Sequence, residues 1–215
     1  MKKIKIWRLL VIVILSFSLL DCLMIKNISN GKSLFFEQNV TLMLNPDVLS
    51  DLVYFPLAAD LSEPNTCAYE DSWQNARTFG GNRKHEGTDL MTVTNERGIY
   101  PVVSMTGGTI EQLGWLKLGG WRIGIRSSSG VYYYYAHLES YAPDLIEGMA
   151  VKAGQFLGFA GDSGYGTEGT TGQFEVHLHV GIYVPGDHGD EAVNPYLYLK
   201  KIEHSKIRAR YANIG

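Results

Sequence analysis

Apolar residues in the second half of the chain come in short runs that are separated by glycine turns. The runs are rich in β-branched and aromatic residues, and pairs of glycine or clusters of serine and glycine stand between them. This spacing predicts an antiparallel all-β domain, and the 24 glycines suit it because tight hairpins need positive φ angles. The expected strands are residues 99–104, 109–113, 121–126 and 131–136, and a short helix is expected at residues 195–200.

The N-terminus has a different pattern. Lysine and arginine are concentrated in residues 1–8, and residues 9–25 are almost entirely apolar. About 17 apolar residues are the lower limit for a helix that crosses a bilayer, and a basic head holds the N-terminus in the cytoplasm. Residues 1–25 are therefore predicted to be a hydrophobic helix, either a retained membrane anchor, which we favour, or a signal peptide cleaved near Ser18. In both cases the rest of the chain is extracytoplasmic.

Length and composition then limit the remaining chain to one domain and argue against a protein that binds nucleic acid. Residues 26–50 have no clear period and are interpreted as a stalk, residues 51–200 as the domain, and residues 201–215 as a basic tail. Hydrophobic residues make up 45% and the net charge is −3, which gives no basic field for nucleic acid. With Cys22 in the predicted anchor, Cys67 has no disulfide partner.

Candidate metal chemistry begins at His85 and Asp89, which have Gly87 between them. Glycine is unfavourable inside a helix and favours a turn that can direct both side chains to one point. An imidazole nitrogen and a carboxylate oxygen are donors that suit zinc. The pair alone is more often a surface contact, so a third ligand from elsewhere is needed.

Three further histidines are candidates to complete this site. His177 and His179 stand two apart in a predicted strand, so both rings point to one face, with Cα atoms roughly 6–7 Å apart. One ring can bind a metal and the other can reach a metal-bound water, and strand geometry does not say which. His137 ends the tyrosine-rich run, where its alternative role is a hydrogen-bonded histidine in a half-buried sheet.

Together these motifs resemble the LytM/lysostaphin-like zinc endopeptidases, which cut cross-link peptides of bacterial cell walls. The likeness covers roughly residues 51–199 and rests on a His-x-x-x-Asp motif, a Tyr-x-His-Leu motif and a His-x-His motif, in that order. It implies a β-sandwich or barrel-sandwich hybrid fold of the lysostaphin-like peptidase type. It further implies that Zn²⁺ is bound by His85, Asp89 and His179 and that His137 and His177 are catalytic. Residues 173–176 depart from the family pattern, which changes the expected shape of the groove.

The resemblance also implies a mechanism and a substrate. A metal-bound water becomes acidic enough to serve as a nucleophile near neutral pH, and His137 and His177 would orient or deprotonate it. Peptidoglycan cross-link peptides are the expected substrate. The loop 161–172, with Thr167, Thr170 and Thr171, is expected to form one wall of a narrow groove, and half of the tyrosines at 132–135 would line its floor.

Other functions were weighed against this one. Residues 161–164 match a serine-protease signature, but His137 lies too close in sequence for that fold. Residues 147–154 resemble the hairpin of biotinyl or lipoyl carrier domains without the modifiable lysine turn. Two histidines and a carboxylate also form the facial triad of iron oxygenases. A non-catalytic wall-binding or scaffolding domain of an envelope complex is the main alternative, and the intact set of polar residues argues against it.

Overall fold

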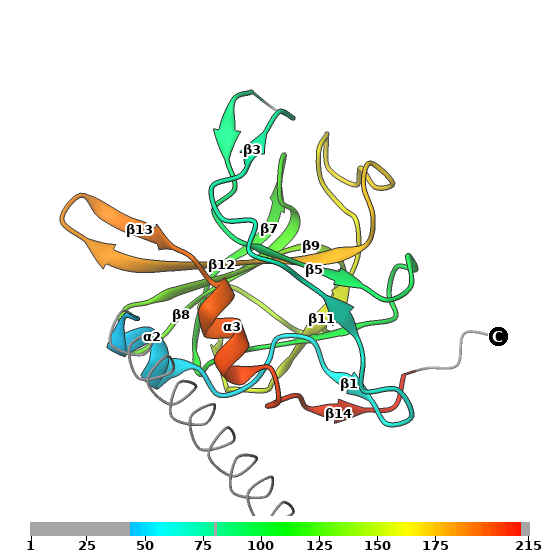
Figure 1. Cartoon of the computed structure of the whole chain (residues 1–215), viewed down its shortest axis with the longest axis horizontal. Coiled ribbons are helices and arrows are strands. Elements are labelled where there is room, and N and C mark those ends of the chain that lie inside the picture. Colours follow the sequence, from blue (N-terminus) through cyan, green and yellow to red (C-terminus); the bar gives the residue numbers. More distant parts are fainter. Residues whose placement is uncertain (1–43, 80, 212–215) are drawn as a thin grey trace, which may run out of the picture. The chain divides into compact units, whose positions relative to one another are not determined.

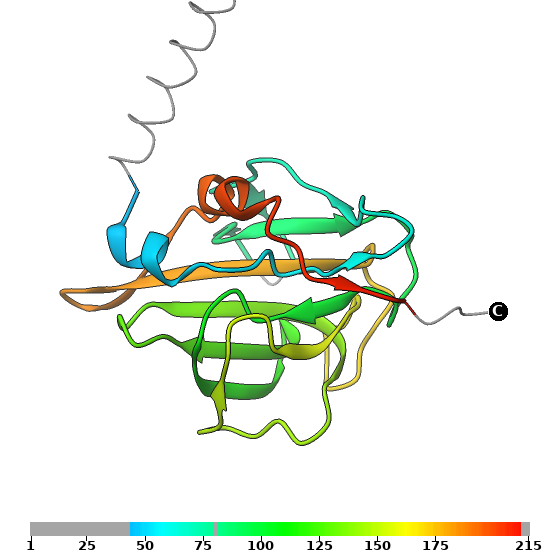
Figure 2. The ribbon, with the colours of Figure 1, turned by 90° about the horizontal axis from the view of Figure 1, so that it is seen from below.

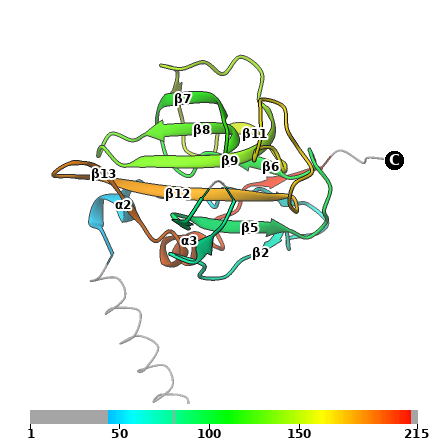
Figure 3. The ribbon, with the colours of Figure 1, turned by 90° about the horizontal axis from the view of Figure 1, so that it is seen from above.

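The computed structural model describes residues 44–79 and 81–211 of the chain, and the described residues from Asn45 onward form one unit by their contacts. Within the described residues, ten strands form one antiparallel sheet, in which the path β10-β7-β8-β9-β12-β5-β2 is joined by β11, β6 and β13 (Figures 1 and 3). The strands of this sheet are β2 Cys67–Ala68, β5 Thr88–Thr92, β6 Pro101–Val103, β7 Gly108–Leu116, β8 Gly120–Arg126, β9 Tyr132–Tyr141, β10 Ala150–Val151, β11 Phe156–Ala160, β12 His177–Gly186 and β13 Gly189–Val193.

The strands predicted from the hydrophobic pattern are confirmed, and β9 extends beyond its expected end. Its Tyr133 and Tyr135 are fully buried, whereas Tyr132 and Tyr134 face a pocket on the other side of the sheet. Buried hydroxyls need partners, and these have them, because Tyr133 donates to Asp51 and Tyr135 accepts from the backbone of Met105. The alternation of a strand thus divides this run between the core and the pocket.

The two ends of the domain lie side by side on one side of the sheet, as Figure 2 shows for the cyan and red segments. Helix α2, Pro46–Asp51, is capped by Asn45 and buries Val48 completely. At the other end lies helix α3, Tyr196–Ile202. Strand β14, Arg208–Ala209, then pairs in parallel with β1, Ala59–Asp60.

The domain therefore extends further at both ends than residues 51–200. Residues 46–50 were assigned from the sequence to the stalk, and residues 201–215 to a solvated tail. Instead, the carbonyl of Ser205 accepts a hydrogen bond from Phe55, and the hydroxyl of Tyr211 donates to the carbonyl of Ala58. Short polar segments carry no periodicity that predicts such pairing, which is why composition alone assigned them to linkers.

The predicted hydrophobic helix at residues 1–25 and most of the predicted stalk lie outside the described residues. Among the helices that are described, none is long and apolar enough to cross a membrane. Cys67 is buried and unpaired, while Cys22 is outside the described part of the chain. The absence of a disulfide consequently stays a prediction.

A short hairpin and a long loop project from the opposite side of the sheet from the termini (Figure 1). The hairpin consists of β3, Ala76–Arg77, and β4, Arg83–Lys84, and the loop follows β11. Between them, β5, β9 and β12 present one face to the space that the hairpin and the loop flank. This arrangement brings residues from distant parts of the chain to one place on the sheet.

Candidate metal centre and active site

Three side chains converge on the central strands. His179 in β12 and Asp89 in β5 are direct partners in the antiparallel register, and His85 lies in the segment that leads into β5. Nδ1 of His179 lies 2.9 Å from Oδ1 of Asp89, and Nε2 of His85 lies 3.1 Å from each of those two atoms. The sequence motifs placed these residues in one site, and the structure brings the three together.

The triangle of donor atoms fits a small divalent cation. In a tetrahedral zinc site with bonds of 2.0–2.1 Å, neighbouring ligand atoms are about 3.3 Å apart, close to the separations found here. Nδ1 of His85 lies 3.2 Å from the carbonyl oxygen of Ser72, which can only accept a hydrogen bond. When Nδ1 carries that proton, the lone pair of Nε2 points at the other donor atoms. Converging lone pairs repel one another unless a cation lies between them.

Two residues hold these ligands in position. The hydroxyl oxygen of Ser72 lies 3.0 Å from Nδ1 of His85, and Nη2 of Arg77 donates to Oδ2 of Asp89 at 2.6 Å. Burial alone raises the pKa of Asp89, but when no cation lies in the triangle, N–H groups of His179 and His85 can donate to the carboxylate, and these hydrogen bonds outweigh burial and hold that pKa below its usual range. Asp89 is therefore an ionised ligand whose second oxygen is fixed by Arg77. Such outer contacts orient ligands and tune metal affinity.

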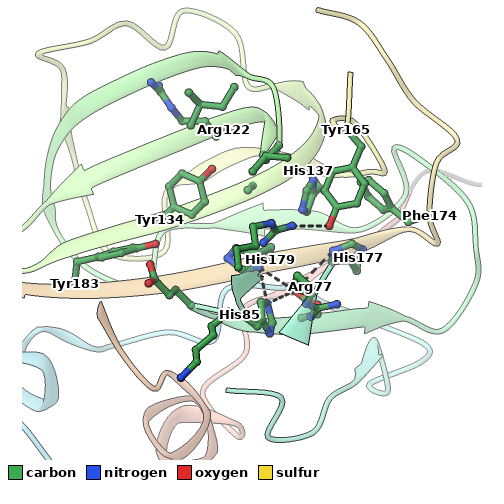
Figure 4. A pocket seen from close by; sticks show the side chains of 18 of the residues that line it. Arg77, His85, Arg122, Tyr134, His137, Tyr165, Phe174, His177, His179 and Tyr183 are labelled. Carbon is green, nitrogen blue, oxygen red and sulfur yellow. Dashed lines mark hydrogen bonds and ion pairs between the residues drawn. The ribbon is translucent and has the colours of Figure 1, made fainter. Parts of the chain in front are cut away.

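His137 and His177 lie beside this triangle (Figure 4). Their ring centroids are 4.7 Å apart, and Nε2 of His177 is 3.8 Å from Oδ1 of Asp89. Nδ1 of His137 donates to the carbonyl of Ser163, and Nδ1 of His177 donates to the carbonyl of Glu175, each at 2.7 Å. Because each carbonyl takes the Nδ1 proton, both neutral rings keep a basic lone pair on Nε2. Each ring is thus prepared to accept a proton at that atom.

A distortion of β9 turns His137 toward the site. Its φ angle is +63°, and the register between β8 and β9 shifts between the pairs Trp121–Leu138 and Ile123–Tyr135. Such a bulge inserts a residue and re-aims a side chain, and a non-glycine residue at positive φ is a strained conformation typical of functional sites. Simple alternation from the tyrosine run does not predict this orientation.

Burial keeps both of these histidines neutral. Desolvation is the main cause of the lowered pKa of each ring. It holds the pKa of His137 well below its usual value and also lowers the pKa of His177. Neighbouring histidines lower the pKa of His137 further. Two neutral imidazoles beside a candidate metal centre are suited to general-base chemistry near neutral pH.

The lowered pKa values predict acid sensitivity of the metal-free domain. Below pH about 6.5 the unfolded chain binds protons on His137 and His177 that the folded chain does not, so the free energy of unfolding should fall with pH. The expected slope is up to about 1.4 kcal/mol per pH unit for each residue. Urea unfolding of residues 45–215 at pH 7, 6 and 5 measures it. His137→Gln should flatten the slope, and the same change at the exposed His188 is the control; an unchanged slope in His137→Gln would refute the assignment.

The cluster opens into a pocket of about 1190 Å³. Tyr132 and Tyr134 lie on its floor, while Thr167, Thr170 and Thr171 do not line it, contrary to expectation. The loop contributes Tyr165 instead. Two of the three hydroxyls form hydrogen bonds elsewhere, because Thr170 donates to the loop backbone and Thr171 accepts from Arg97.

The end of the pocket near His137 is narrowed by aromatic rings. Phe174, in the segment that departs from the family pattern, packs on His137 with 4.7 Å between centroids and on Tyr165 with 4.8 Å. Tyr165 also stacks on Phe79 at 4.2 Å, and its hydroxyl accepts a hydrogen bond from Arg83 at 3.0 Å. The loop and the hairpin therefore touch above this end of the groove.

Fold and site together define a β-sheet protein with a His–Asp–His donor set and two neutral histidines in a groove, an arrangement suited to a peptidase. Residues 83–195 match the model of peptidase family M23, and the chain belongs to this family. The resemblance to LytM and lysostaphin that the sequence motifs indicated is thereby confirmed.

The relatives carry related names. The chain is 43% identical over 143 residues to the L-Ala–D-Glu endopeptidase of Bacillus subtilis, a match that covers 66% of this chain and 43% of that protein. It is 33% identical over 108 residues to lysostaphin of Staphylococcus simulans, covering 49% of this chain and 20% of lysostaphin. The chain thus spans less than half the length of these curated relatives.

A solved structure supports the fold. A crystal structure from Ruminococcus gnavus, described as a glycyl-glycine endopeptidase LytM, superposes with a TM-score of 0.72 at 50% sequence identity. The match covers 77% of this chain and 66% of the other. The lysostaphin-like fold expected from the motifs is therefore the observed one.

Proposed function

We propose that this protein is a zinc-dependent endopeptidase that hydrolyses peptide cross-links of bacterial peptidoglycan. The observation that carries the proposal is the triangle of donor atoms from His85, Asp89 and His179, with separations of 2.9–3.1 Å, beside two neutral histidines. Membership of family M23, and relatives named as endopeptidases, support the reaction class.

The residues divide the chemistry between them. His85, Asp89 and His179 would hold Zn²⁺, which supplies a water of lowered pKa and polarises the scissile carbonyl. Nε2 of His137 or His177 accepts the proton of the attacking water. The same proton then passes to the leaving amine nitrogen as the C–N bond breaks, and the N–H of the protonated ring stabilises the negative oxygen formed before that step.

Metal removal tests this proposal. Purified protein should hold about one zinc per chain and release peptides from purified peptidoglycan, and a chelator should abolish the release because the nucleophile is lost. Added Zn²⁺ should restore it. The readouts are atomic emission for zinc and mass spectrometry of the released peptides. Full activity after complete zinc removal would exclude the mechanism.

The rival function is a non-catalytic wall-binding or scaffolding domain. It predicts that the protein binds purified peptidoglycan, holds less than one zinc per chain and releases no peptide. The basic head and apolar run of residues 1–25 support placing the domain outside the cytoplasm, either anchored in the membrane or secreted after cleavage. These two cases differ in whether the protein is found with the membrane fraction or in the medium.

A further inference from the structure

Arg122, on β8, is a cation in the wall of the pocket without an acidic partner among the described residues. Only 9% of it is exposed, and it is one of the residues that line the pocket. Nη2 donates to the neutral amide oxygen of Gln112 at 2.8 Å, and Nη1 has no hydrogen-bond partner. By contrast, Arg77 pairs with Asp89, and Arg126 pairs with Glu111 and Asp190.

A buried charge is costly unless an opposite charge compensates it, and an unmade hydrogen bond adds to that cost. Guanidinium charge is delocalised over a planar group, so an anion in the pocket beside it also compensates the charge near the buried Nη1. Planar carboxylates match this group in geometry. The surroundings of Arg122 are therefore complete only when an anion occupies the pocket beside it.

The register of the sheet places Arg122 close to the candidate metal centre. It lies between the pairs Trp121–Leu138 and Ile123–Tyr135, so it faces Ala136 and His137 on β9. Ala136 is in turn the partner of His179 on β12. Two strand spacings, about 10 Å, therefore separate the backbones of Arg122 and His179, which is roughly three residues of extended peptide. Figure 4 shows Arg122 and Tyr134 on one side of the pocket.

Two tyrosines add hydrogen-bond donors next to Arg122. The hydroxyls of Tyr132 and Tyr134 lie against Gly124 and Gly119, in β8 and in the turn before it, and a side chain at either glycine would collide with them. Both tyrosines line the pocket. A carboxylate beside Arg122 can thus receive hydroxyl donors as well as guanidinium donors.

We propose that Arg122, together with Tyr134, forms a subsite for a carboxylate of the peptide substrate, within about three residues of the scissile bond. This inference rests on the proposed function and specifies its substrate as an acidic peptide. The distinction matters because relatives are named for L-Ala–D-Glu and for glycyl-glycine bonds, and only the first name includes an acidic residue, whose second carboxyl group can be free. An uncharged glycine bridge offers nothing to compensate Arg122.

A matched pair of peptides tests the subsite. One is an L-alanyl-D-glutamyl peptide with a free glutamyl carboxylate, and the other has that carboxylate converted to a carboxamide. The full chain should hydrolyse the carboxylate form with a kcat/KM at least about tenfold higher, since charge-assisted hydrogen bonds are the strong ones. Calorimetry with the chelated, metal-free chain should give a similar ratio of dissociation constants, which measures the subsite independently of turnover.

Variants assign the preference to Arg122. Arg122→Gln should reduce both ratios to within twofold, and Arg122→Lys, which keeps the charge, should retain part of them. Arg126→Gln is the matched control, because Arg126 lies on the same strand and its own acidic partners already compensate it. It should keep the wild-type ratios. Circular dichroism tests whether each variant is folded. If Arg122→Gln does not fold, the comparison of the two peptides with the wild-type protein still decides whether the pocket prefers the carboxylate.

The outcomes separate the subsite from the proposed function. Hydrolysis of both peptides at equal rates, with equal binding, would overturn the subsite and leave the peptidase function intact. Tighter binding of the carboxylate form without hydrolysis of either peptide, lost in Arg122→Gln, would support the subsite and contradict the peptidase function for this bond. Binding of neither peptide, or a preference that persists in Arg122→Gln, would also overturn the subsite.

Discussion

In the His179→Ala variant we expect zinc and peptidase activity to be lost together, whereas His177→Ala should retain about one zinc per chain and lose activity by about a hundredfold or more. Nδ1 of His179 lies 2.9 Å from Asp89, so its loss removes one corner of the donor triangle. Nε2 of His177 is 3.8 Å from the same carboxylate, outside the triangle, and its loss removes a proton acceptor.

His137→Ala should behave as His177→Ala does, because its Nε2 is free for the same reason. Zinc measured by atomic emission, beside peptide hydrolysis, distinguishes the three variants, and replacement of the exposed His188 by alanine is the control. If His177→Ala lost zinc while His179→Ala kept it, the two roles would be exchanged. Full activity in His137→Ala would remove that residue from the mechanism.

The histidines and the aspartate of the sequence motifs could be assigned to the site from the sequence, because local spacing determines which face of a strand each side chain occupies. His179 is in a strand whose period fixes its face, and antiparallel pairing with β5 then sets it opposite Asp89. The same period buries Tyr133 and Tyr135 in the core and directs Tyr132 and Tyr134 toward the pocket. Strand period and glycine turns are local properties, and sequence patterns report them directly.

Residues that act through long-range contacts were missed. No sequence motif includes Ser72 or Arg77, and they reach His85 and Asp89 only because the segment that leads into and forms the β3–β4 hairpin folds back toward the metal site. Arg122 stands in an ordinary amphipathic strand, and only the structure reveals that no acidic group in the described part of the chain pairs with it. A single sequence contains no signal for such pairings, because they depend on which loops close over which strands.

Gly87 has a physical role that the sequence did not show. From the sequence, it was expected to allow a turn between His85 and Asp89, and the chain does bend at Gly87. Its φ angle is not in the positive range, so the bend by itself does not require glycine. A side chain at this position would, however, meet the ring of His179 and the backbone of β12. Glycine is therefore required here for close approach.

Gly87→Ala should consequently damage the metal centre without altering any ligand. A Cβ atom there would lie 2.5 Å from Nε2 of His179 and 2.7 Å from the carbonyl oxygen of Val180. The ring can rotate away only by moving Nδ1 out of the donor triangle, and the backbone contact forces β5 and β12 apart. Overpacking of this kind costs about 1–3 kcal/mol of stability, and we expect zinc affinity and activity to fall by about a hundredfold or more.

Gly107→Ala is the matched control for this substitution, because its φ angle is also outside the positive range and the nearest atom to a Cβ there is 3.7 Å away. Zinc competition with a chromophoric chelator gives the affinities, and urea unfolding of the metal-free proteins gives the stabilities. Gly107→Ala should match the wild type in zinc affinity. If Gly87→Ala did so too, the contact between Gly87 and the ring of His179 would not constrain the ligand, and the close approach of β5 and β12 would have no part in forming the metal centre.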